Sequence, residues 1–388
     1  MWTCLGIRLA ILFPSSWVLC VGLLLSPMIA VAAAQTHISV AVNTSNPSVH
    51  FNSGPQSNRV SAAQAALAKC REVLAKTDQE QGMGVCELVR MDGIAVTTAE
   101  ELLPRGAAVP LYLWRFKTAS ATVYLAGTIH VLKPSLYPLP PQFLQAYQNT
   151  NNLVFEVDLS RYPPVQVRQL TRQYAEMEAQ SLRQSLPADT YQQLVEAGRL
   201  YGLPVGQMQA FKPMLAFQQL GMMSFLALGY DPDFGIDHYF GQLGQKHPEQ
   251  VLQLETLEFQ FNLLLNQPLN VQNAVLQQAL DELPNIESET SDMISAYFAG
   301  RDAELLALIE NQVGDHPLAK AFNQQLIDQR NKHMARKITG YLDTPDSYFV
   351  LVGAAHLIGH NGIVAMLERA GFPAQRIYSD QLLPEIRR

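Results

Sequence analysis

Two short motifs of the form Gly-x-x-His carry the side chains of this sequence that are best suited to chemistry. The first spans Gly127 to His130 and the second spans Gly353 to His356, and each ends an apolar, β-rich run. Ligands of α/β proteins bind beyond the carboxyl ends of the strands, so a histidine just past each strand would lie at the site-bearing edge. Glycine there lets the backbone turn sharply and leaves room for a bound group. One such motif more often marks a structural histidine, but two favour a shared site.

A third apolar run, LVFEVD, carries two carboxylates. Glu156 and Asp158 are two residues apart, so in a strand they point to the same face. Acidic side chains in an apolar strand are costly to bury unless they pair or bind a cation. With two imidazoles they suit a divalent cation such as zinc, manganese or cobalt, which polarises a carbonyl and lowers the pKa of a bound water. The alternative is that both carboxylates form salt bridges with Arg330 or Lys212.

The order of several short strings makes the sequence resemble the TraB/GumN family. After GTIH and FEVD come GIDHYF, LETLEFQ, RNKHM and GAAH, within a stretch from Leu111 to the C-terminus. The ordered set is much more specific than any one string. The family is similar to the Tiki proteins, membrane-tethered metalloproteases that act on secreted signalling proteins, and more distantly to the erythromycin esterase-like and ChaN-like folds. The resemblance implies an α/β core in which both Gly-x-x-His motifs face one cleft.

Carried onto this chain, the resemblance assigns roles to single residues. The metal ligands that it implies are His130, Glu156 and His356, with Glu156 as ligand or general base. The implied catalytic residues are these three and Arg330. The strings LETLEFQ and RNKHM add three cleft-lining residues as candidates for substrate binding: Glu255, Glu258 and Asn331. Glu255 and Glu258 would share a face if their segment is helical, or they could form a capping or salt-bridge pair.

Three residues near these strings have competing interpretations. The planar guanidinium of Arg330 suits a carboxylate, either from a peptide substrate or from Glu156. Asp237, in GIDHYF, is expected to cap or brace a helix, with a catalytic role as the less favoured alternative. His360 lies four residues after His356 and would share its face on a helix, but its neighbours favour a turn.

Composition divides the first part of the chain into three segments. Residues 1–34 have the layout of a secretory signal, with an apolar run followed by small residues, and we expect cleavage near Ala34; the alternative is an uncleaved anchor. Residues 35–59, rich in Ser, Asn, Thr and Pro, are expected to be a flexible leader. Residues 60–105 are expected to form a small element of one helix and the strand CELVRM. Its two cysteines most simply form a Cys70–Cys86 disulfide, which would stabilise it by about 3 kcal/mol.

Residues 106–388 are expected to form one α/β domain of the TraB/GumN type. A β-hairpin opens it, a helical stretch from Pro164 to about Asn311 fills the middle, and Met214 to Leu228 is predicted to be a buried helix. A strand, helix, strand succession near the C-terminus implies a parallel crossover. The predicted fold class is therefore α/β, with a mixed central sheet, a large helical insertion and a small disulfide-linked N-terminal element.

Charge and missing motifs exclude several function classes. The 388 residues carry a formal net charge of -7 with only 16% charged residues, so no basic surplus is present to bind nucleic acid. The sequence has no Gly-x-Ser-x-Gly elbow, no phosphate-binding loop, no dinucleotide fingerprint and no His-Glu-x-x-His helix. Serine hydrolases, nucleotide enzymes and helical zinc proteases are therefore disfavoured.

The favoured function is an exported, metal-dependent hydrolase, with peptidase as the leading class. A divalent metal would polarise the scissile carbonyl of a peptide or protein substrate while Glu156 or a neighbouring carboxylate activates water. The alternative is a protein that binds and sequesters peptides without cleaving them, and a third possibility is a scaffold derived from an enzyme. We expect a periplasmic or secreted bacterial protein with no stable membrane span once the signal is removed.

Overall fold

The structure is a computed structural model that describes residues 36–43, 46–77, 86–95, 108–311 and 316–383. The signal segment predicted for residues 1–34 lies outside these ranges. Within them, no helix is both long enough and apolar enough to cross a membrane.

A six-stranded mixed sheet forms the core, in the order β10-β5-β6-β9-β7-β8. In chain order its strands are β5 (Pro110–Lys117), β6 (Thr122–Thr128), β7 (Asn152–Phe155), β8 (Val251–Gln253), β9 (Ser347–Gly353) and β10 (Ala374–Tyr378). The predicted hairpin is β5 and β6, and the neighbours β6, β9, β7 and β8 are all parallel. The predicted α/β class with a mixed sheet is confirmed.

The strand, helix, strand succession at the end of the chain carries it past two strands, β6 and β5, to one edge of the sheet. β10 runs in the same direction as β9, but it pairs antiparallel with β5 at the far edge. The helix α14 (Ile363–Arg369) makes this crossover and ends before Gly371, which adopts a left-handed φ of 93°. Glycine accommodates this conformation at little cost, as at many helix ends.

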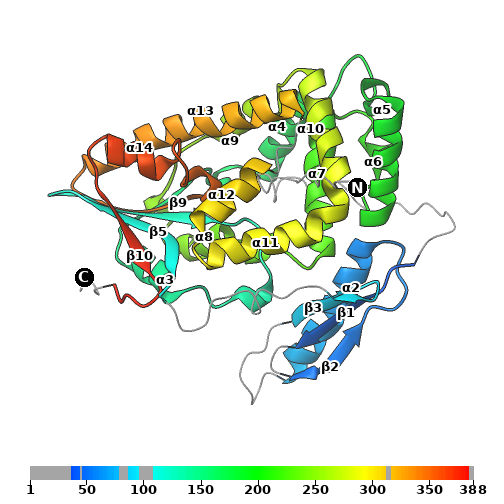
Figure 1. The fold of residues 1–388 in the computed structure, drawn as a ribbon, viewed down its shortest axis with the longest axis horizontal. Helices are drawn as coiled ribbons and strands as arrows, with labels where there is room; N and C mark the ends of the chain where they lie inside the picture. Colours follow the sequence, from blue (N-terminus) through cyan, green and yellow to red (C-terminus); the bar gives the residue numbers. More distant parts are fainter. Residues whose placement is uncertain (1–35, 44–45, 78–85, 96–107, 312–315, 384–388) are drawn as a thin grey trace, which may run out of the picture.

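Helices cover both faces of the sheet, which explains why β9 is apolar along nearly its whole length. In Figure 1, α13 and α14 lie above the sheet and α3 lies below it. The remaining helices are α3 (Pro141–Gln148), α4 (Pro164–Ala175), α5 (Leu182–Ser185), α6 (Ala188–Tyr201), α7 (Pro213–Ala227), α8 (Ile236–Gly244), α9 (Leu257–Leu265), α10 (Leu269–Glu282), α11 (Ile286–Phe298), α12 (Asp302–Asn311) and α13 (Pro317–Leu342). The buried helix predicted from Met214 is α7, which packs against α10, α6 and α2.

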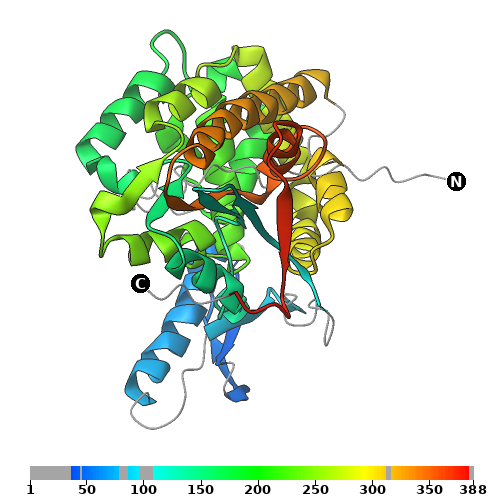
Figure 2. The ribbon, with the colours of Figure 1, turned by 90° about the vertical axis from the view of Figure 1, so that its left-hand side faces the viewer.

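The N-terminal element is a second, smaller unit, drawn in blue at one end of the molecule in Figures 1 and 2. Its antiparallel sheet has the order β2-β1-β3-β4, and one helix packs on it. The elements are β1 (Ser39–Asn43), β2 (Asn46–Asn52), α2 (Arg59–Thr77), β3 (Cys86–Met91) and β4 (Ile94–Ala95). The predicted disulfide joins Cys70 of α2 to Cys86 of β3, with their Cα atoms 5.8 Å apart.

The prediction of a flexible leader over residues 35–59 was wrong. Within this segment Ser39–Asn43 forms β1 and Asn46–Asn52 forms β2, and β1 pairs on its other edge with β3. The polar Ser39 is fully buried, because its hydroxyl donates to the Met91 sulfur and its backbone N–H donates to the Ser53 hydroxyl. Pairing with a distant strand stabilises a segment whose own composition favours a loop.

Candidate functional site

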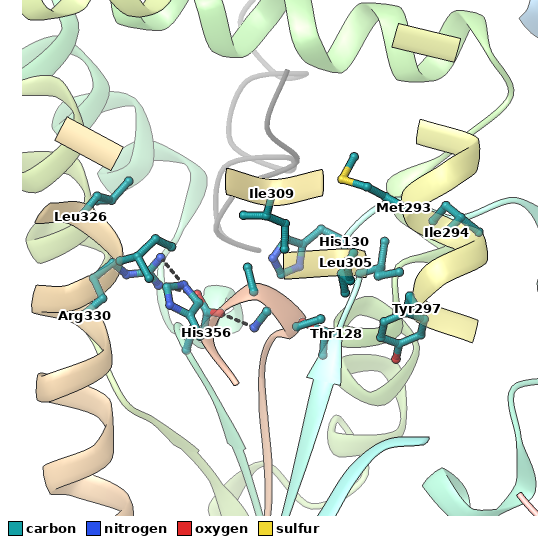
Figure 3. A pocket seen from close by; sticks show the side chains of 16 residues that line it. Thr128, His130, Met293, Ile294, Tyr297, Leu305, Ile309, Leu326, Arg330 and His356 are labelled. Carbon is teal, nitrogen blue, oxygen red and sulfur yellow. Dashed lines mark hydrogen bonds and ion pairs between the residues drawn. The ribbon is translucent and has the colours of Figure 1, made fainter. Parts of the chain in front are cut away.

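Three neighbouring parallel strands deliver the predicted site residues to one edge of the sheet. The register pairs Thr128 at the end of β6 with Gly353 at the end of β9, so the two Gly-x-x-His motifs leave the sheet side by side. β7, on the other side of β9, ends at Phe155 and is followed directly by Glu156. Figure 3 shows the result, with His130 and His356 around one small cavity and Arg330 reaching it from α13.

Arg330 is the centre of the polar network in this cavity. Its side chain is only 3% exposed. Nη2 donates to Glu156, Nε and Nη2 donate to Oε2 of Glu255 at 3.0 and 2.8 Å, and Nη1 donates to Nε2 of His356 at 3.0 Å. Of the two partners considered for Arg330, a substrate carboxylate and Glu156, the structure shows Glu156. Lys212, the other cation considered for a salt bridge, donates to backbone carbonyl groups.

Glu156 is held as a buried anion. Its Oε1 accepts the backbone N–H of Gly353 at 2.6 Å, and its Oε2 accepts from Arg330. Burial raises the pKa of this carboxyl, but Arg330, both histidines and the Gly353 N–H outweigh burial and lower the pKa to about 2. Glu156 is therefore ionised across the neutral range and is a weak base there.

His356 is held as a neutral imidazole. Its Nδ1–H donates to Oδ1 of Asn331 at 2.7 Å, which leaves the lone pair of Nε2 to accept from Arg330. Burial and the neighbouring guanidinium lower the pKa of His356 to about 3. Asn331, predicted to bind substrate, lies behind His356 outside the cavity lining and orients that ring, while its amide also donates to the carbonyl of Asn361.

The environment of His130 differs from that of His356. Nε2 of His130 faces the cavity and is not hydrogen-bonded to Arg330. Nδ1–H donates to Oδ1 of Asp237 at 2.9 Å, and Nε2 points toward Gly353. Burial lowers the pKa of His130, but the carboxylates of Asp237 and Glu156 outweigh burial and leave the pKa above its usual value. The two carboxylates therefore favour the protonated form of His130.

The helix α8 places Asp237 on His130. The backbone N–H of Ile236 donates to the carbonyl of Ile129 at 3.0 Å, which docks the start of α8 on the first motif. A Cβ on Gly235 would lie 2.4 Å from the carbonyl oxygen of His130, so only glycine permits this approach. Asp237 was expected to cap or brace a helix. In the structure its carboxylate accepts a hydrogen bond from His130 and so orients that ring.

Three predicted residues lie away from the cavity. Asp158 does not share a strand face with Glu156, because β7 has already ended, and it pairs with Arg161 at 2.9 Å. Glu258 is exposed in the first turn of α9, where it accepts from the hydroxyl of Tyr174. His360 is also exposed.

The cavity itself has a polar floor and apolar walls. Its volume is about 50 Å³. The walls come from α11, α12 and α13 and consist mainly of Met293, Ile294, Leu305, Ile309, Leu326 and Ile327. Tyr297 adds a hydroxyl that donates to the carbonyl of Gly127 at 2.7 Å and so supports the first motif. Sequence patterns gave no sign of these wall residues, because their helices resemble ordinary core helices.

The predicted metal ligands do not complete a metal site in this arrangement. A catalytic zinc site of this kind uses three protein donors directed at one point. The position that a Cβ on Gly353 would take lies 3.6 Å from Nε2 of His130 and 3.4 Å from Oε1 of Glu156, but the atom that His356 presents there is Cδ2. Nε2 of His356 is turned to Arg330. Within the described residues, no cluster of three or more His, Cys, Asp or Glu side chains could hold a metal ion.

Fold and site together define an α/β protein whose parallel strands bring two Gly-x-x-His motifs and a buried glutamate to one cavity. The chain belongs to the TraB/PrgY/gumN family, whose sequence model matches residues 112–376. The resemblance noted from the ordered strings is therefore confirmed.

Curated relatives include both animal and bacterial proteins. Metalloprotease TIKI1 of Danio rerio is 24% identical over 323 residues, covering 70% of this chain and 64% of the relative. Metalloprotease TIKI2 of Xenopus tropicalis is 22% identical over 337 residues, covering 74% and 64%. Uncharacterized protein YbaP of Escherichia coli (strain K12) is 24% identical over 257 residues, covering 63% and 87%. The chain thus spans less than two thirds of the length of these Tiki relatives, and no solved structure matches it.

Proposed function

We propose that this protein is a hydrolase that cleaves peptide bonds at the cavity between His130 and His356. The observation that carries the proposal is His130 itself, whose Nδ1–H is bound by the Asp237 carboxylate while Nε2 opens to the cavity beside Glu156. A histidine oriented by a carboxylate in this way is the usual arrangement of a general base. The names of the Tiki relatives support a proteolytic reaction and protein substrates.

We assign the general base to His130 instead of Glu156. Glu156, with a pKa of about 2, has little affinity for a proton near neutral pH, and the Nε2 lone pair of His356 is occupied by Arg330. The raised pKa makes His130 a stronger base than an ordinary imidazole. The neutral form of His130 removes a proton from water as the water oxygen attacks the carbonyl carbon. The imidazolium, stabilised by Asp237, then gives the proton to the amide nitrogen, the carbon–nitrogen bond breaks, and an acid and an amine leave.

The cavity is large enough to hold the attacking water. About 50 Å³ exceeds the roughly 10–15 Å³ that one water requires. A water at its floor has two acceptors, Nε2 of His130 and Oε1 of Glu156, both facing the space above Gly353. The relatives' names imply a divalent metal, but the donors do not fit one as arranged, so we derive no step through it.

The walls of the cavity indicate which peptides would be cleaved. Aliphatic and thioether side chains from three helices surround the polar floor. Burying an apolar substrate side chain against them is favourable by about 25 cal/mol per Å² of buried area. We therefore expect cleavage next to aliphatic residues in preference to charged ones.

Export also belongs to this proposal. Disulfides persist in oxidising compartments, and the Cys70–Cys86 pair lies in a small element with its own minor core. This supports action in the periplasm or outside the cell.

The test is a cleavage assay with a pool of synthetic peptides of mixed sequence, analysed by mass spectrometry. We expect the wild type to cleave peptides beside aliphatic residues and His130→Ala to lose this activity, while His360→Ala, which alters an exposed histidine, keeps it. Cleavage that survives in His130→Ala would overturn the assignment of the base. Peptides that bind but stay intact in the wild type would instead support the sequestering alternative.

A further inference from the structure

A second hollow, much larger than the cavity between the two motifs, borders the site at Asp237. It lies between α8, the end of β7 and the segment that leads into α4, and its volume is about 610 Å³. Ligand pockets usually measure about 300–1,000 Å³. The cavity between the motifs, at about 50 Å³, is well below this range. A peptide therefore needs binding surface outside that cavity, and we call the second space the α8 hollow.

Glycine keeps the α8 hollow open. A Cβ on Gly244 would lie 2.7 Å from Cδ2 of Leu153, so this glycine lets α8 pack closely on β7. Gly241 lies one turn earlier, and among the residues that the structure describes a Cβ there would meet only Cζ of Phe155, at 3.9 Å. Glycine weakens a helix relative to alanine, and packing at position 241 does not require it. The missing side chain instead leaves room for a bound group beside Phe155.

The charge that lines the α8 hollow is negative. Within the described part of the chain, the formally charged lining residues are Asp158 and Asp237. Asp158 is already paired, because Nε of Arg161 donates to it at 2.9 Å. Asp237 accepts the Nδ1–H of His130 through Oδ1, and no described group donates to its Oδ2. Because 15% of this side chain is exposed, Oδ2 is the acceptor that a ligand in the hollow can use.

The rest of the lining is mainly apolar. Phe155 and Val157 contribute from the end of β7, Val251 from the start of β8, and Tyr162 from the segment before α4. Lysine and arginine side chains fit such a surface, because they bury an aliphatic stem while the charged head reaches a polar group. An aliphatic side chain would offer the carboxylate no donor, and an acidic one would be repelled by it. The hollow is therefore complementary to a basic side chain.

We propose that the α8 hollow binds a lysine or arginine side chain of the peptide substrate, with its charged head on Oδ2 of Asp237 and its stem on Phe155 and Val157. That the ligand is a substrate peptide rests on the proposed function, whereas the shape and charge of the hollow do not. Because Asp237 also holds His130, the bound side chain lies next to the reaction cavity. Peptides with a basic residue close to the aliphatic residue at the cleaved bond should bind most tightly.

The test is calorimetry of the full chain with a short peptide that has blocked ends and contains one lysine beside one leucine. In its analogue, norleucine replaces lysine, which keeps an aliphatic stem and removes the ammonium. We expect the wild type to bind the lysine peptide at least about tenfold more tightly, because a charge-assisted hydrogen bond contributes that much or more. Mass spectrometry of the same samples measures cleavage separately, so a failure of the hydrolase proposal is distinguished from a failure of binding.

Two variants locate the bound side chain, each with a matched control. Gly241→Leu fills the hollow and should bind the lysine peptide about tenfold more weakly, because stem and head both lose their contacts. Gly340→Leu, the same change at an exposed position of α13, should bind it as the wild type does. Asp237→Asn removes the charge and keeps the shape, so it should bind both peptides about equally. Asp233→Asn removes an exposed carboxylate outside the hollow and should keep the preference for lysine.

Several results would overturn the proposal. These are equal affinity of the wild type for the two peptides, unchanged affinity in Gly241→Leu, and a preference for lysine that survives in Asp237→Asn. A norleucine peptide with a free amino terminus is the last comparison. If it binds as tightly as the lysine peptide, the hollow takes an amino terminus and not a basic side chain, which contradicts the proposal. If Gly241→Leu does not fold, Asp237→Asn and its control decide alone.

Discussion

Replacing Gly353 by alanine tests the cavity as the reaction centre with very little change to the fold. The backbone at Gly353 has φ -52° and ψ 136°, which any residue adopts. The added methyl group would lie 3.4 Å from Oε1 of Glu156 and 3.6 Å from both Nε2 of His130 and Cδ2 of His356, all ordinary contact distances. Because alanine also restricts the unfolded chain, we expect the free energy of unfolding to stay within about 1 kcal/mol of the wild type.

The same methyl group occupies the position where the attacking water must lie. A water that hydrogen-bonds to His130 and Glu156 needs distances of roughly 2.7–3.2 Å to both, and a carbon between them pushes it away by about 1 Å or more. Such a displacement typically reduces the rate by about 100-fold. Peptide cleavage followed by mass spectrometry and unfolding in urea measure the two effects separately.

The control for Gly353→Ala is Gly340→Ala, an exposed position on α13 where a Cβ would contact nothing within 4 Å. It should gain up to about 1 kcal/mol from helix propensity and keep full activity. A folded Gly353→Ala protein that cleaves at the wild-type rate would refute the placement of the reaction above Gly353. Loss of folding in this variant would refute the argument from the backbone angles.

Three further outcomes follow from the contacts described above. Asp237→Asn should lower the pKa of His130 and reduce cleavage about 5- to 30-fold, because a charge-assisted hydrogen bond becomes a neutral one; an NMR titration that finds the pKa of His130 unchanged would contradict this. Glu156 has a pKa of about 2 in the folded protein against an ordinary 4.5, so it stabilises the fold by about 3 kcal/mol. This stabilisation is complete above pH 4.5 and is lost as the pH falls toward 2. Urea unfolding of Glu156→Gln should lack this acid dependence, and a pH profile equal to that of the wild type would argue against a depressed pKa. Replacing Cys70 and Cys86 by serine should lower the stability of the N-terminal element by about 3 kcal/mol, measured by hydrogen exchange of β1 and β3, and equal exchange in both proteins would exclude a stabilising role for the disulfide.

The placement of His130, Glu156 and His356 could be predicted from the sequence, because it depends on local signals. Each follows an apolar run that forms a strand, and parallel strands end at the same edge of a sheet. The sequence left two partners open for Arg330, the carboxylate of a peptide substrate and that of Glu156. The packing of α13 against the strand ends places Arg330 beside Glu156. Asp237 acts on a histidine far away in the sequence, and nothing in its own string indicates that partner.

The start of α9 explains why Glu255 and Glu258 have different environments. α9 begins only at Leu257, and the side chain of Thr256 caps it by accepting the N–H of Phe259. Glu255 therefore precedes the helix and turns to Arg330, while Glu258 lies in the first turn and faces solvent. The threonine is a recognisable capping signal that the sequence interpretation did not use.

Strand β9 lies between β6 and β7, although it is synthesised long after both. The two early strands have no pairing with each other in the final sheet, so the site edge stays open until residues near Gly353 arrive. Contacts between such distant segments form slowly compared with local ones. A chain that is still being synthesised consequently lacks the assembled cavity, and the proposed hydrolase would be inactive during synthesis without any separate inhibitor.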